Sequence, residues 1–142
     1  MMRKLDNRGA ASFEMILVFV PLFTLMFVIF DLGRYAITQQ SLNALADAGA
    51  RAVMIKCYTP DVTKSAPVSP SGCSTSDPNP LSSTAMQNAA PFLFFGGLTP
   101  TLAVTAGANA LTVTASQPGF AMIMSIWGTA LNAPSASTSI PF

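Results

Sequence analysis

The sequence predicts an α+β protein in which a long N-terminal transmembrane helix continues into a small, disulfide-containing C-terminal domain. Three observations predict this fold. Residues 10–30 are almost uniformly apolar, a helical pattern continues behind them to residue 56, and ten of the eleven prolines lie in residues 57–142. The prolines mark a boundary near residue 57, and we expect domain 57–142 to contain a short helix and a β-hairpin or small antiparallel sheet.

The composition excludes several classes of function. Of the 142 residues, 51% are hydrophobic and 9% are charged, and the formal net charge is +1. Near-neutrality removes the electrostatic basis of nucleic-acid binding, which depends on clustered Lys and Arg. The chain contains no histidine, which excludes Ser-His-Asp and Cys-His catalysis and HExxH zinc chemistry. These absences leave enzymes possible but remove the most familiar kinds, and we expect a protein that is not an enzyme and that uses no cofactor, metal, small-molecule substrate or nucleic acid.

The apolar run Ala10–Phe30 has the length of a membrane span. Its 21 residues form a helix of about 31 Å, and the hydrocarbon core of a bilayer is about 30 Å thick. An 86-residue outer domain is too small to enclose such a rod. A cleaved secretory signal has a shorter apolar region that ends in small residues, whereas Asp31 and Leu32 follow this run. Pro21 is compatible with the span, because neighbouring groups satisfy the carbonyl that it frees.

The leader, residues 1–9, sets the orientation of this span. Arg3, Lys4 and Arg8 precede the apolar run. The positive-inside rule therefore places the leader in the cytoplasm and residues beyond about 31 on the opposite side. We expect a single-pass protein of the inner (cytoplasmic) membrane with a periplasmic or extracellular C-terminal domain.

Behind the span, apolar and small residues recur at three- or four-residue steps with one wider gap, as in a helix with one buried face. These residues are Leu32, Tyr35, Leu42, Leu45, Gly49 and Val53. The spacings Asp31–Arg34 and Asp47–Arg51 suit helical ion pairs. We predict one long helix over residues 10–56. Its Ala-rich second half reflects helix propensity and a narrow face for lateral packing in a helical bundle.

The residues at the start of the apolar run resemble a known processing site. In RGAASFE, residues 8–14, a short basic leader ends in Gly and a Glu stands fifth after it, as in type IV pilin-like proteins. The wider stretch, residues 8–55, resembles the TadE-like minor pilins of the tight-adherence (Tad) pilus. The matching features are RGAAxxE, the Pro-containing apolar run, the Asp-Leu-Gly-Arg step and the segment ADAGARA.

This resemblance implies a structural function. A membrane-embedded prepilin peptidase would cut between Gly9 and Ala10, where the missing side chain lets a protease approach the backbone. Glu14 would act in assembly by pairing with the new Ala10 ammonium of another subunit. The protein would take part in assembling a Tad or type IV-like pilus for surface attachment. Its partners would be the membrane, the peptidase, other pilin subunits and the assembly machinery.

Two alternatives to a minor pilin or pseudopilin remain. One is a major filament subunit. Met15 follows Glu14, where major Flp-type pilins have a Glu-Tyr pair, and this difference together with the large outer domain favours the minor class. The other alternative is a signal-anchored periplasmic binding or enzymatic domain, which requires a set of catalytic groups that the outer domain largely lacks.

The outer domain begins with a predicted disulfide. Cys57 and Cys73 are the only cysteines, and an even count in an oxidising compartment indicates a bond. Closing a loop of this length contributes about 3 kcal/mol. Asp61, Lys64 and Asp77 are the last charges of the chain. We interpret them as solvated loop charges rather than as a glycosidase or Ca²⁺ site.

A short helix is predicted over residues 82–95. Ser82 or Ser83 supplies a cap, and Pro91 is expected to split the helix. Met86, Ala90 and Leu93 share the spacing of an inward face.

The remaining segments predict strands and additional core. Residues 102–106 and 111–115 alternate apolar residues with Thr across residues 107–109, which is typical of a β-hairpin. FAMIMSIW, residues 120–127, is too short for a second membrane span, and we interpret it as domain core, with a subunit contact as the alternative. Residues 133–142 form either a strand or a tail.

Overall fold

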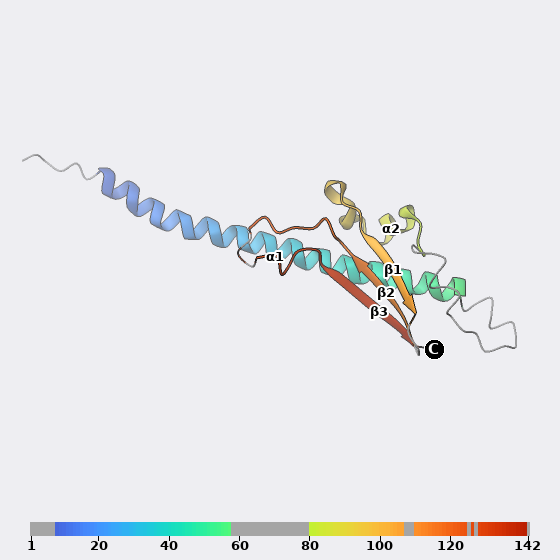
Figure 1. Cartoon of the computed structure of the whole chain (residues 1–142). Coiled ribbons are helices and arrows are strands. Elements are labelled where there is room, and N and C mark those ends of the chain that lie inside the picture. The colour runs from blue at the N-terminus through green and yellow to red at the C-terminus, as the bar shows by residue number, and fades with distance from the viewer. Residues whose placement is uncertain (1–7, 58–79, 107–109, 125, 127, 142) are drawn as a thin grey trace, which may run out of the picture.

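The computed structural model describes residues 8–57, 80–106, 110–124, 126 and 128–141. Figure 1 shows one long helix with a small sheet and two short helices packed beside its C-terminal half. The elements are α1 (Arg8–Cys57), α2 (Ser83–Ala89), the 3₁₀ helix η2 (Pro91–Gly97), β1 (Thr101–Ala106), β2 (Ala110–Ser116) and β3 (Ser135–Pro141). The α+β class and the long N-terminal helix followed by a small antiparallel sheet are confirmed.

Helix α1 is continuous over 50 residues and contains Pro21. At 1.5 Å per residue it is about 75 Å long, far longer than the sheet that packs on it. The N-terminal half of α1 therefore projects beyond the rest of the chain (Figure 1).

The sheet has three antiparallel strands in the order β1-β2-β3. Val104 faces Val113 across the predicted hairpin, and Ala115 faces Ala136 in the second pair. The predicted hairpin is confirmed, and the C-terminal segment is a strand rather than a tail. Burial alternates along β2, so that one face of the sheet packs inward, as the alternation of apolar residues with Thr predicts.

The core lies between this sheet face and the C-terminal half of α1. Leu42, Leu45 and Ala46 are completely buried. A Cβ atom at Gly49 would lie 2.9 Å from Cδ2 of Leu102 and 3.1 Å from Cγ1 of Val113, so glycine is needed for this close approach. The chain's own sheet thus occupies part of the narrow face that the sequence suggested for lateral packing.

Helix α2 and η2 cover the edge of this core. The Ser82 hydroxyl caps α2 by accepting a hydrogen bond from the Ala85 N–H at 3.2 Å, and Pro91 starts η2. Met86 and Leu93 are buried. The helix predicted over residues 82–95, its cap and its division at Pro91 are confirmed.

The β2–β3 loop, residues 117–134, differs in part from the expectation of domain core. Phe120 and Met122 are buried, but Ile123 is 71% and Ile126 52% exposed; Trp127 lies outside the described residues. The loop leaves the sheet and runs back along α1 toward its N-terminal half (Figure 1). No second layer covers Ile123 and Ile126 there, within the part of the chain that the structure describes, so for these two residues the expectation was wrong.

Candidate membrane and assembly helix

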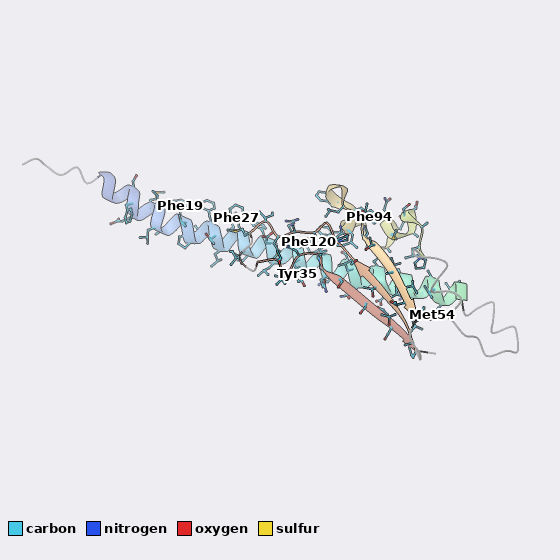
Figure 2. All side chains as sticks on the ribbon, in the orientation of Figure 1. Phe19, Phe27, Tyr35, Met54, Phe94 and Phe120 are labelled. Carbon is cyan, nitrogen blue, oxygen red and sulfur yellow. The ribbon has the colours of Figure 1, made fainter. Side chains whose placement is uncertain are left out.

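The N-terminal half of α1 exposes apolar side chains on every side. Phe13, Leu17, Val20, Leu25 and Phe30 are each about 60% exposed or more. Figure 2 shows side chains, those of Phe19 and Phe27 among them, projecting from this half of α1. Helix Ser12–Ile55 is long and apolar enough to cross a membrane, and only 6% of its most apolar 18-residue window is buried inside the structure. A core helix of a soluble domain would be mostly buried, whereas a membrane-spanning helix is apolar all round.

Glu14 is the one charged side chain in this apolar surface. It is exposed and lies between the exposed side chains of Phe13 and Met15. Gly9 and Ala10 lie in the first turn of α1. Ala10 and Glu14 are four residues apart, so that they share one helix face about 6 Å apart along the axis. The geometry therefore suits a contact between the Glu14 carboxylate and an amino group at residue 10.

The middle of the apolar half contains two local interactions. Thr24 Oγ1 donates to the Val20 carbonyl at 2.8 Å, which satisfies a polar hydroxyl within the helix. Phe19 and Phe23 stack at 5.6 Å between ring centroids. Pro21 has no N–H to donate to the carbonyl of Leu17, yet α1 passes through it unbroken.

Asp31 marks the place where the outer part of the chain first contacts α1. Its side chain is buried, and Oδ2 accepts a hydrogen bond from the Met124 N–H at 2.7 Å. Arg34 Nη1 lies 3.5 Å from Asp31 Oδ1, which confirms the predicted i,i+3 pair. The Arg34 guanidinium also lies 5.4 Å from the ring centroid of Phe120. The contact with Met124 was not predicted, although a lone Asp directly after an apolar run is a signal that a partner is needed.

Asp47 has a different partner from the one expected. It accepts a hydrogen bond from Thr138 Oγ1 at 2.8 Å, and in the described part of the chain it makes no ion pair with Arg51. Gln39 Nε2 similarly donates to the Ser135 carbonyl at 3.0 Å. Both bonds join α1 to β3, so the polar residues of α1 help to position the sheet.

A small cavity of about 50 Å³ lies between η2 and α1. It is lined partly by Arg34, Phe92, Phe95 and Gln117. Gln117 is buried and donates from Nε2 to the Leu93 carbonyl at 2.9 Å. This space is enough for one or two water molecules and too small for an organic substrate.

Four residues singled out in the sequence have side chains outside the described part of the structure. Cys73, Asp61 and Asp77 lie outside the described residues, and of Cys57 only the backbone at the end of α1 is described. The disulfide therefore stays a prediction. Within the described ranges, no group of three or more His, Cys, Asp or Glu side chains is arranged to hold a metal ion.

Residues 9–51 match the family model described as TadE-like protein. The chain carries a TadE-like segment. This match confirms the resemblance inferred from RGAASFE and the following apolar run. No curated protein and no solved structure matches the chain.

The TadE-like segment coincides with particular parts of the fold. It begins at Gly9, includes Glu14 and the whole apolar run, and ends at Arg51 within the part of α1 that packs on the sheet. The matched segment is thus entirely helical, and the sheet lies outside it. The family likeness consequently concerns the anchor and its packing face.

Proposed function

We propose that this protein is a structural minor pilin or pseudopilin that takes part in assembling a Tad pilus. The single observation that carries the proposal is the TadE-like segment itself, whose apolar N-terminal half is left uncovered by the described part of the chain. Such a surface needs lipid or other helices as its partner. The proposed sequence of events is insertion in the inner membrane, removal of the leader, and transfer of the helix from lipid to neighbouring subunits.

Processing is proposed between Gly9 and Ala10. These residues lie in the first turn of α1, and terminal helical turns unwind easily. A protease thereby gains the extended backbone that it requires, and Gly9 offers no side chain to obstruct it. Cleavage would leave an ammonium on Ala10, within one helical turn of the Glu14 carboxylate.

The first test is N-terminal sequencing of protein from peptidase-competent cells, which should begin at Ala10. Gly9→Val should retain the leader, because a branched side chain obstructs the subsite. Gly33→Val is the matched control, since the position is also on α1 and a Cβ there meets nothing within 4 Å; its leader should be removed normally. An intact leader on mature wild-type protein would contradict the proposed processing.

The second test concerns Glu14. A carboxylate inside the apolar run is costly in lipid, by about 2–3 kcal/mol near the bilayer centre and less near its edge. Pairing with the Ala10 ammonium of a neighbouring subunit would neutralise both charges and fix the axial register of the two helices. Glu14→Ala should therefore be cleaved and membrane-inserted but incorporated poorly in filaments, and Glu14→Asp should be intermediate.

The measurement is the fraction of the protein in sheared filaments at native expression, relative to the fraction in membranes. Normal incorporation of Glu14→Ala would mean that the carboxylate only contacts lipid headgroups. The same preparation separates a minor from a major subunit, because mass spectrometry of the filaments gives the abundance of this chain relative to the main subunit.

A further inference from the structure

The β2–β3 loop is built as an ordered projection. Near its base, the Gln117 N–H donates to the Pro134 carbonyl and the Ala133 N–H donates to the Phe120 carbonyl, each at 3.0 Å. Further out, the Met122 N–H donates to Asn132 Oδ1 at 3.1 Å. These bonds join the two arms of the loop, so that Met122 and the adjacent Ile123 are held at a defined place.

Asp31 fixes that place along α1. The bond from the Met124 N–H to Asp31 Oδ2, at 2.7 Å, puts the outer end of the loop at the level of residue 31. The apolar run Ala10–Phe30 ends directly before this residue. Because that run fills about 31 Å, the thickness of a hydrocarbon core, residue 31 lies at its edge when the helix spans a membrane.

The side chains at this level are exposed and apolar. Ile123 is 71% and Ile126 52% exposed on the loop, while Ile29 and Phe30 are each 60% exposed on α1. The loop contains no charged residue. Exposed apolar side chains therefore end the span just before Asp31, and others flank Met124, whose N–H bonds to Asp31 where the bilayer interface would be.

We propose that Ile123 and Ile126 of the β2–β3 loop form a membrane foot and insert in the lipid interface on the side of the outer domain. The proposal rests on the membrane anchoring in the proposed function. The occupant is lipid rather than protein, because apolar groups lie within the headgroup–acyl boundary when they are held at this depth. Asp31 positions the foot: its carboxylate holds the Met124 N–H and is itself held by Arg34. A foot and a span together restrict the tilt of the outer domain on the membrane.

The test uses the full chain in phosphatidylcholine vesicles at low protein-to-lipid ratio, with single tryptophans quenched by lipids brominated near the headgroup or deep in the acyl chain. Trp127 is the only tryptophan, so all variants carry Trp127→Phe. Ile123→Trp reports on the foot, and Phe27→Trp reports on the span. Ile55→Trp is the matched control: its side chain is 68% exposed but lies about 36 Å further along α1 from Asp31.

Lipids brominated near the headgroup should quench the fluorescence of Ile123→Trp at least about twofold more than that of Ile55→Trp. Lipids brominated deep in the acyl chain should quench the fluorescence of Phe27→Trp. Quenching of Phe27→Trp without quenching of Ile123→Trp overturns the foot and leaves the anchor intact. Absence of quenching at both positions overturns the anchor, and the foot with it. A blue-shifted Ile123→Trp that lipid bromine does not quench is covered by protein and also overturns the proposal. Ile126→Trp repeats the measurement in case Ile123→Trp fails to fold, as checked by helical circular dichroism.

A separate measurement tests whether Asp31 positions the foot. Asp31→Ala removes the acceptor for the Met124 N–H, whereas Asp31→Asn retains one carbonyl oxygen. In the Ile123→Trp protein, Asp31→Ala should reduce shallow quenching about twofold and Asp31→Asn should reduce it less. Equal quenching in all three proteins overturns the positioning role.

Discussion

The two halves of α1 belong to one helix but have opposite relations to the rest of the chain. The N-terminal half, residues 12–30, is the more apolar and is exposed almost throughout. The C-terminal half, residues 31–57, contains more polar residues and holds the completely buried Leu42 and Leu45. Side chains of α1 are buried where the sheet packs on the helix and exposed where it does not. The apolar half has no such packing partner among the residues that the structure describes.

Side-chain size separates the halves as clearly as polarity does. In the C-terminal half, Ala46, Gly49 and Ala50 let the sheet approach the helix backbone closely. The N-terminal half carries large exposed side chains around its circumference, as at the consecutive residues Leu17, Val18 and Phe19. A three-stranded sheet covers only a short length of a helix of about 75 Å. The sheet packs on the C-terminal half of α1, where small residues permit close packing.

The largest expected difference in stability is between two Leu→Ala substitutions, one in each half of α1. Leu45→Ala removes a completely buried side chain and should lower the free energy of unfolding of the outer domain by about 2–5 kcal/mol. Leu25→Ala, at a position 60% exposed, should change it by less than about 0.5 kcal/mol. The measurement is denaturant unfolding of the detergent-solubilised full chain, followed by near-ultraviolet circular dichroism. Similar losses for both variants would contradict the difference between the halves.

A second pair of variants tests close approach. Gly49→Leu places a side chain against Leu102 and Val113, where even a Cβ would meet atoms at 2.9 and 3.1 Å, and should destabilise the outer domain by about 1–3 kcal/mol. Gly33→Leu meets nothing within 4 Å and should be neutral or slightly stabilising, because Leu favours helix over Gly. The same unfolding assay measures both variants. An unchanged free energy of unfolding in Gly49→Leu would show that the sheet does not pack against Gly49 as described.

The sequence predicted those features that depend on local patterns. The apolar run, the Ser82 cap and the hairpin of residues 102–115 each have a short-range signature in composition or period. The match to the TadE-like family likewise covers only residues 9–51. Residue spacing was therefore sufficient for the helices and the hairpin, whereas it left β3 undecided between a strand and a tail.

The features that were missed all depend on contacts between distant parts of the chain. The bond of Met124 to Asp31 and that of Thr138 to Asp47 join residues more than ninety positions apart. The sequence offered Arg51 as a partner for Asp47 because i,i+4 spacing is visible without a fold. The exposure of Ile123 was also missed. An apolar side chain suggests a core position, and only the path of the loop in the fold shows that Ile123 is exposed.

The smallest predicted effect concerns the polar contact between the C-terminal half of α1 and the sheet. Thr138→Val keeps the shape and strand preference of the side chain but removes the hydroxyl that donates to Asp47 Oδ1 at 2.8 Å. Because both groups are accessible to water, the loss should lie near the low end of about 0.5–1.5 kcal/mol. Asp47→Asn is the matched control, since it retains the accepting oxygen and should lose less than Asp47→Ala. A double-mutant cycle of Thr138→Val with Asp47→Ala isolates the contact. A coupling energy of about 0.5 kcal/mol would mean that a polar bond as well as close packing joins α1 to β3. A coupling energy of zero would mean that apolar packing alone explains why the sheet covers the C-terminal half of α1 and not the N-terminal half.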